Sequence, residues 1–178
     1  MMELTNYGIT LRRLTEDKIE MVRQWRNDPK IQQYMEFKDY ITPEMQAAWF
    51  KRINNDNNYY FIIVYEGKEV GLINVKDVDY EQKTGEPGIF IYDDDCLDSD
   101  VAIRASLCMG DFIWNVLQME KMYIHIMRDN IRAIKYNSLF GYKLAEGQEG
   151  VMNQLYVLTR EDVKNNKRTK QFKKIFNK

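Results

Sequence analysis

The segment IHIMRDNIRAIKYNSLFGYKL, residues 124–144, decides the fold because its pattern changes from strand to helix and back to strand. Alternating apolar residues predict a strand over residues 121–127. A helix is expected over residues 130–140, and Gly141 is the residue type favoured just past a helix end. Residues 142–145 predict the next strand. This unit is typical of a mixed α/β sheet.

Outward from this unit, the same criteria predict five more strands, over residues 8–14, 59–65, 69–75, 88–92 and 154–158. Helices are expected to begin at Thr15, at Asp28-Pro29 and at Thr42-Pro43. A long helix is expected over residues 102–117, and Thr159 with Asp162 resembles a capping box that opens a basic C-terminal helix. The sequence therefore predicts an α/β (α+β) fold, with about seven strands in a central sheet flanked by helices.

Composition narrows the function classes. The chain has 178 residues, a formal net charge of −1, two cysteines and one histidine, which favours one ordered domain without a disulfide framework or a His-based metal site. No apolar run is long enough to cross a bilayer. We expect a cytoplasmic protein, a monomer or homodimer, with no metal and with neither nucleic acid nor membrane as a partner.

The order of elements resembles the GNAT superfamily of acyl-CoA-dependent N-acetyltransferases. Asn130, Ala133 and Ile134, followed by Gly141-Tyr142, match its strand-Asn-x-x-Ala-Ile-helix-Gly-Phe pattern. The segment GEPGIFI, residues 85–91, is similar to the strand that holds the pantetheine arm. WRNDPKIQQYM, residues 25–35, resembles the branch of PseH-type amino-sugar acetyltransferases, close to the ribosomal-protein N-acetyltransferases. The resemblance covers essentially the whole chain, 1–178, as one domain.

The resemblance implies acetyl-CoA as co-substrate and a splay between the fourth and fifth predicted strands, 88–92 and 121–127. Unpaired backbone groups there would bind the pantetheine amides. The pyrophosphate would lie at the helix N-terminus near Val101. The implied cofactor-binding residues are Ile89, Phe90, Ile91, Ser99, Asp100, Val101, Ala102, Ile103, Asn130 and Ala133.

Two positions depart from the family pattern. The loop before the helix reads Leu97-Asp-Ser-Asp-Val-Ala102, where only Ala102 fits, and a carboxylate near pyrophosphate weakens binding by about 1 kcal/mol when solvated. Either the acids point outward, or the loop has lost the cofactor. Asn137 stands where the family places the tyrosine that protonates the thiolate. Tyr136, one residue earlier and about 100° away on a helix, is expected to face elsewhere.

Glu86 is the candidate general base, because a carboxylate near the fourth strand can take a proton from the attacking amine. The alternative is a solvated acid at a strand start. Asp77 and Asp79 are weaker candidates, and the backbone N–H groups of Phe90 and Ile91 would stabilise the oxyanion. His125 is interpreted as a packed core residue rather than a base.

The candidate acceptor-binding residues, each set against a core or surface role, are Trp25, Arg26, Asn27, Tyr34 and Trp49. The basic run at residues 164–178 is interpreted as a surface helix that docks Phe172, Ile175 and Phe176, with nucleic-acid or membrane contact as the alternative.

The predicted function is direct acetyl transfer to a primary amine of a small molecule, preferably a nucleotide-linked amino sugar. A protein N-terminus and a polyamine remain open as acceptors. A non-catalytic interaction module with the same fold is the second hypothesis, motivated by the acidic loop and Asn137.

Overall fold

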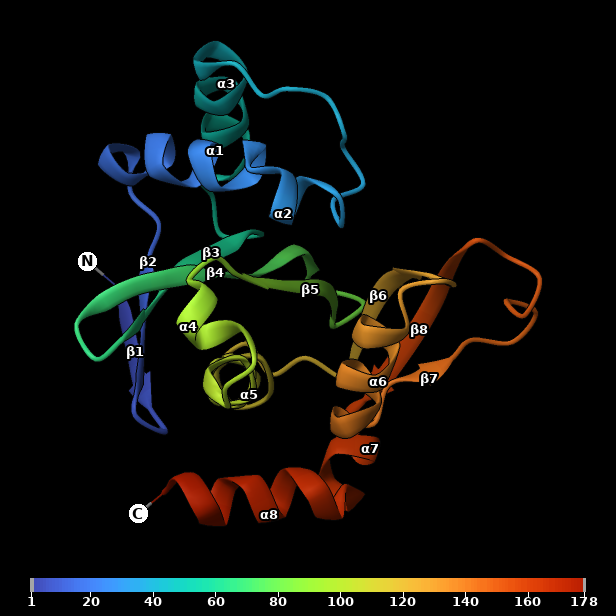
Figure 1. The fold of residues 1–178 in the computed structure, drawn as a ribbon. Helices are drawn as coiled ribbons and strands as arrows, with labels where there is room; N and C mark the ends of the chain where they lie inside the picture. The colour runs from blue at the N-terminus through green and yellow to red at the C-terminus, as the bar shows by residue number, and fades with distance from the viewer. Residues whose placement is uncertain (1, 178) are drawn as a thin grey trace.

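The computed structural model describes residues 2–177 and contains an eight-stranded mixed sheet in the order β1-β2-β3-β4-β5-β6-β8-β7 (Figure 1). The strands are β1 (Glu3–Asn6), β2 (Ile9–Arg13), β3 (Tyr59–Tyr65), β4 (Lys68–Asp79), β5 (Thr84–Ile91), β6 (Lys121–Met127), β7 (Lys143–Leu144) and β8 (Asn153–Thr159). The α/β fold class is confirmed.

The additional strand is β1, which pairs with β2 in a hairpin. Tyr7 and Gly8 both have positive φ angles, 56° and 73°, the geometry that a tight two-residue hairpin turn requires. The sequence did not predict β1 because Leu4 is the only large apolar residue in ELTN.

The helical elements are η1 (Glu16–Lys18), α1 (Ile19–Asn27), α2 (Pro29–Gln32), α3 (Pro43–Ile53), α4 (Asp94–Leu97), α5 (Val101–Asp111), the π-helical turn η2 (Phe112–Val116), α6 (Ile131–Phe140), α7 (Arg160–Asn165) and α8 (Lys167–Phe176). Both Pro-containing starts are confirmed. The Asp28 side chain accepts from the Lys30 N–H, and Thr42 accepts from the Met45 N–H.

Three helix expectations need correction. The long helix predicted over residues 102–117 is α5 followed by a π-helical turn, and the acidic stretch forms the short helix α4. The Thr159–Asp162 capping box is present but opens only α7. The chain then turns at Asn166, whose side chain caps α8. Phe172 and Phe176 dock on the core as expected, whereas Ile175 is 49% exposed.

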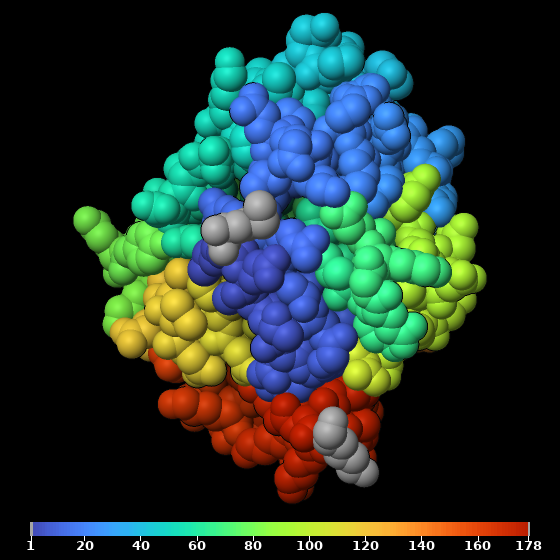
Figure 2. All heavy atoms as spheres, turned by 90° about the vertical axis from the view of Figure 1, so that its left-hand side faces the viewer, coloured from blue at the N-terminus to red at the C-terminus, as the bar shows by residue number. Residues whose placement is uncertain are grey.

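Helices cover both faces of the sheet. Figure 1 shows α1, α2 and α3 on one face, α5 and α6 on the other, and α8 beneath α5. The larger core lies between the sheet and α5, and a smaller one, around Val22 and Phe50, lies under α1 and α3. Figure 2 shows the N-terminal strands, in blue, between the helices of residues 16–53 and the C-terminal helix. No helix within residues 2–177 is long and apolar enough to span a membrane.

The expected splay lies between β5 and β6. These parallel strands share only the pairs Thr84↔Lys121 and Gly85↔Met122 and then separate. β5 remains paired with β4 as far as Ile91, so its opposite edge beyond Gly85 has no strand partner within the described residues. That edge therefore offers backbone groups to a ligand.

Candidate active site

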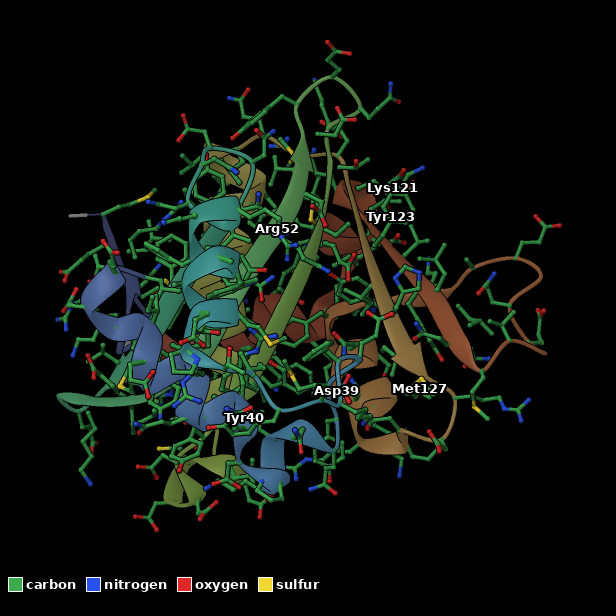
Figure 3. The ribbon with its side chains drawn as sticks, turned by 90° about the horizontal axis from the view of Figure 1, so that it is seen from above. Asp39, Tyr40, Arg52, Lys121, Tyr123 and Met127 are labelled. Atoms are coloured by element: carbon green, nitrogen blue, oxygen red, sulfur yellow. The ribbon has the colours of Figure 1, made fainter. Side chains whose placement is uncertain are left out.

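A cavity of about 1710 Å³ follows the splay between β5 and β6. β4 and β5 supply one wall, β6 and α6 another, and the inner turns of α5 close it from below. The segment from Gln33 to Ile41, between α2 and α3, lies over its other end. Figure 3 looks down on that end, with Arg52 of α3 on one side and Lys121, Tyr123 and Met127 of β6 on the other.

The first of these walls is built where β4 and β5 pair. Asn74 lies opposite Gly88, and Lys76 lies opposite Glu86. A Cβ on Gly88 would stand 3.0 Å from the Asn74 Oδ1 atom, so the missing side chain leaves room for this amide over the strand. The Lys76 Nζ atom is 3.3 Å from the Glu86 carboxylate, which lines the cavity beside this amide. Glu86 therefore faces the cleft with a cation beside it.

Tyr60, on β3, completes this side of the cavity. Burial raises the pKa of Tyr60 to about 12, while the nearby charge of Arg26 opposes the rise and those of Asp77 and Glu86 add to it. The hydroxyl therefore stays protonated at neutral pH and can donate a hydrogen bond to a bound molecule.

Arg26 projects from α1 into the same region. Its guanidinium lies over the Trp49 ring, 5.2 Å from the centroid, and its Nε has no hydrogen-bond partner among residues 2–177. Burial lowers the pKa of Arg26, and no acidic side chain of the described chain lies within ion-pair distance. Arg52 lines the cavity from the same direction. Arg26 and Arg52 therefore bring positive charge to this end of the cavity without an ion-pair partner among the described residues.

Two of the five predicted acceptor-binding residues have structural roles instead. Trp25 is buried in the smaller core and stacks on Tyr92 with ring centroids 5.2 Å apart. Asn27 uses its amide to bind the backbone of Ile41. Arg26, Trp49 and Tyr34 line the cavity, and Tyr34 is 64% exposed.

The predicted pyrophosphate loop folds with its acids turned away from one another. Asp100 bonds Arg104 at 2.8 Å, and Arg104 lies over the Phe176 ring on the α8 side. The Ser99 hydroxyl accepts the Val101 N–H, and the Asp100 side chain does not cap α5.

The first-turn N–H groups of Ala102 and Ile103 have no partner within α5, because a helix leaves its first N–H groups unpaired. The N-terminus of α5 therefore presents donors and a positive dipole end, despite the acidic sequence around it.

The predicted β5 residues divide between the cavity and the core. Ile89 and Phe90 line the cavity, whereas the side chain of Ile91 is buried in the larger core. Only the backbone of Ile91, and not its side chain, is therefore available for the predicted cofactor binding.

Asn130 and Ala133 lie where α6 begins, on the cavity wall. The Asn130 side chain caps the helix by accepting the Ala133 N–H at 3.1 Å. The carboxamide of Asn137 donates to the Ala133 carbonyl at 2.9 Å, which leaves its oxygen free to accept.

Tyr136 lines the same cavity as Asn137, contrary to the expectation that it faces elsewhere. Its hydroxyl donates to the Ala102 carbonyl at 2.9 Å and lies 2.7 Å from the Ser106 hydroxyl. Burial raises the pKa of Tyr136, and the Ser106 hydrogen bond offsets part of that rise. In this arrangement Tyr136 joins α6 to the first turn of α5.

The interpretation of His125 as a core residue is wrong. β6 alternates so that Met122, Ile124 and Ile126 are buried, and His125 points to the exposed face at the cavity. The helices α1–α3 cover β3, β4 and β5, which leaves this face of β6 open (Figure 1).

Sequence reasoning did not single out Tyr60, Asn74, Arg52 or Arg132, which all line the cavity. Tyr60 and Asn74 lie in strongly apolar strands. The alternation of residues along a strand shows which side chains share a face, but it does not show that this face lines a cavity. Arg52 has the sequence appearance of an ordinary surface arginine.

Comparison with known proteins identifies this architecture. The family model described as "Acetyltransferase (GNAT) domain" matches residues 9–142, which include the splayed strands and α6. The chain belongs to the GNAT acetyltransferase family. It is therefore an acyltransferase, and acetyl-CoA is its acyl donor.

The relatives of this GNAT protein include a spermidine acetyltransferase and an acetyltransferase named PseH. Spermidine N(1)-acetyltransferase of Escherichia coli (strain K12) is 22% identical over 152 residues, 85% of this chain and 80% of the relative. Acetyltransferase PseH of Campylobacter jejuni (strain ATCC 700819 / NCTC 11168) is 23% identical over 139 residues, 76% of this chain and 80% of the relative.

Solved structures show the same fold. Apo FdhC, described as a nucleotide-linked sugar GNAT, superposes with a TM-score of 0.78 at 21% identity and covers 96% of this chain and 97% of its own. Spermidine N-acetyltransferase from Vibrio cholerae, in complex with CoA and spermine, superposes with a TM-score of 0.74 at 16% identity. The match covers 90% of this chain and 100% of the spermidine acetyltransferase.

Proposed function

We propose that this GNAT protein transfers the acetyl group of acetyl-CoA directly to the primary amine of a nucleotide-linked amino sugar. The observation that carries the acceptor assignment is the half-buried guanidinium of Arg26, whose Nε is buried without a hydrogen-bond partner and which lines the cavity without an acidic partner among the described residues. A buried cation without a counter-charge is costly, so this site favours an anionic ligand. The phosphates of a nucleotide provide that charge.

The aromatic side chains around Arg26 support the same acceptor. Trp49 and Tyr60 meet edge to face with ring centroids 5.1 Å apart, and both line the cavity. Aromatic faces suit the flat or C–H-rich surfaces of bases and sugars. FdhC, which is described as a nucleotide-linked sugar GNAT, supports this acceptor class, and PseH belongs to the branch that residues 25–35 resemble.

The donor fits the splay. Acetyl-CoA supplies a thioester that an amine can attack. The free edge of β5 between Glu86 and Ile91 would bind the pantetheine amides, with the Phe90 and Ile91 N–H groups near the oxyanion. The Ala102 and Ile103 N–H groups at the N-terminus of α5 would bind pyrophosphate.

Glu86 is the proposed base. It would accept the amine proton, directly or through water, while Lys76 keeps a positive charge beside it. CoA would leave as a thiolate and take its proton from water, and the free oxygen of Asn137 would then accept a hydrogen bond from the resulting thiol. Tyr136 is a weaker candidate for the acid, because its hydroxyl is already engaged by Ala102 and Ser106.

A polyamine is the competing acceptor, since the spermidine acetyltransferases are also relatives and Asp77 and Glu86 face the cavity. Lys76, Arg26 and Arg52 oppose a polycation at the same wall. Charge therefore favours the nucleotide-linked sugar.

The test compares acetyl-CoA turnover with a UDP-linked amino sugar, the free amino sugar, spermidine and a peptide N-terminus. We expect the UDP-linked sugar to have the highest kcat/KM. Arg26→Gln should raise its KM by about tenfold or more while leaving the KM for acetyl-CoA unchanged. Lys51→Gln, which removes an exposed charge on the same helix as Arg52, is the matched control. Preferred turnover of spermidine, unaffected by Arg26→Gln, would contradict the acceptor assignment.

We further propose a single acetyltransferase domain acting in the cytoplasm as a monomer or homodimer. The sheet is continuous across the described residues, 2–177. Both cysteines, Cys96 and Cys108, are buried and free, as a reducing compartment favours.

A further inference from the structure

Arg132 joins the two walls of the cavity at the end where α5 begins. It is the second residue of α6, and its Nη2 atom donates to the Leu97 carbonyl at 2.9 Å and to the Asp98 carboxylate at 3.1 Å. Leu97 ends α4, on the opposite side of the opening, and Arg132 itself lines the cavity. A cation therefore lies across the entrance, next to the N-terminus of α5.

Three other acids near this entrance are already engaged. Asp94 bonds Lys30 at 2.9 Å, Asp100 bonds Arg104 at 2.8 Å, and Asp93 accepts the Asp95 N–H as the cap of α4. Lys30 and Arg104 are thereby occupied on the outer side of the loop. Arg132 is the cation of this group that lines the cavity, and Asp98 is its counter-charge.

The ion pair between Arg132 and Asp98 is weak, so Arg132 can readily exchange Asp98 for another anion. The two side chains are 61% and 92% exposed, and ion pairs in that setting contribute little because water screens them and solvates each partner. A phosphate group carries more charge than one carboxylate and accepts both arms of a guanidinium. Phosphate is therefore the better partner for Arg132.

We propose that Arg132 is a phosphate-binding residue for CoA and that Asp98 is its intramolecular competitor. Without ligand, Asp98 holds Arg132 across the entrance, and on binding Arg132 exchanges this carboxylate for a phosphate of CoA. The basic group that the loop at residues 97–102 lacks is thus supplied from α6. This inference rests on the proposed donor site and adds a residue that the loop sequence does not reveal.

The test is calorimetric titration of the full chain with CoA at moderate salt. We expect Arg132→Gln to weaken binding by about tenfold, because a charge-assisted contact is lost. Asp98→Asn should tighten binding by about two- to fivefold. This gain should vanish in the double variant with Arg132→Gln, because the arginine for which Asp98 and phosphate compete is then absent. Lys135→Gln on α6 and Asp95→Asn on α4, both exposed and outside the cavity lining, are the matched controls and should leave the Kd unchanged.

A second titration with dephospho-CoA identifies which phosphate is bound. An effect of Arg132→Gln that persists assigns the pyrophosphate, and one that disappears assigns the 3′-phosphate. Wild-type binding of CoA with the same Kd in Arg132→Gln would overturn this inference alone. An Asp98→Asn gain that survives in the double variant would also overturn the competitor role. Wild-type protein that binds no CoA at millimolar concentration would instead overturn the donor site itself.

Discussion

The Asn27 side chain binds both backbone groups of Ile41: its Oδ1 accepts the Ile41 N–H at 2.8 Å, and its Nδ2 donates to the Ile41 carbonyl at 2.9 Å. Arg23 donates to the same carbonyl at 2.9 Å. The end of the segment between α2 and α3 is thus fixed to α1, and this segment covers the end of the cavity where we propose that the acceptor binds.

Asn27→Ala should therefore weaken both folding and acceptor binding. Two hydrogen bonds to a buried backbone are lost, so the free energy of unfolding should fall by about 1–3 kcal/mol, measured in urea. The KM of the acceptor should rise while the Kd of CoA stays unchanged. Gln24→Ala, on the exposed side of α1, is the control, and equal acceptor KM in both variants would show that the segment does not contribute to binding.

Glu86→Gln should separate catalysis from donor binding. Removing a general base costs roughly 10²- to 10⁴-fold in kcat, whereas the Kd of CoA should stay within about twofold. Glu81→Gln, an exposed acid at the turn between β4 and β5, should behave as wild type. Retention of full kcat in Glu86→Gln would assign the base elsewhere.

Buried tyrosines should limit stability at high pH. The pKa of Tyr60 rises from 10.0 to about 12, so the folded chain keeps a proton that the unfolded chain loses above pH 10. The stabilisation is fully present below pH 10 and is lost as the pH rises through 12, and each pKa unit corresponds to about 1.4 kcal/mol.

The pKa values of Tyr7 and Tyr59 are raised in the same direction, chiefly by burial. Denaturant unfolding between pH 8 and 12 should therefore show a falling free energy of unfolding, with a shallower slope in Tyr60→Phe. A slope identical to that of wild type would mean that Tyr60 ionises as readily in the folded chain as in the unfolded one.

Gly71→Ala should disturb the strand that carries the site. A Cβ at Gly71 would stand 2.4 Å from the Phe90 carbonyl oxygen, a backbone atom that cannot rotate away. We expect a loss of about 3 kcal/mol in the free energy of unfolding, together with weaker CoA binding, because β5 must shift. Gly150→Ala, where a Cβ meets nothing within 4 Å, is the control. Equal stability of the two variants would contradict this packing.

The sequence predicts most of the elements, because local signals set them. Pro29 and Pro43 mark helix starts, Gly141 adopts a φ of 100° at a helix end, and the alternation in YYFIIVY identifies a central strand. Signals that depend on the tertiary structure were missed. The π-helical turn after Asp111 and the break at Asn166 leave a continuous helical pattern in the sequence, so the sequence predicts one helix in each case.

The sequence predicts where in the fold the site lies, but it predicts only some of the side chains that line it. Glu86, Arg26 and Trp49 were predicted and do face the cavity. His125 was misassigned, because an alternating strand pattern does not show that the helices stop short of covering β6. The sequence predicts Asn27 as an acceptor-binding residue, because it does not show that this side chain binds the backbone of Ile41.

The splay has a consequence for the lifetime of the protein. Two registered pairs hold β5 to β6, so a donor bound at the proposed site would take the place of a missing strand. A ligand that binds only the folded state adds to its stability. At a concentration one hundred times its Kd, that gain is about 2.7 kcal/mol. We therefore expect added CoA to slow degradation of the chain by a nonspecific protease. In a cell, the abundance of the enzyme would then follow the supply of its own substrate.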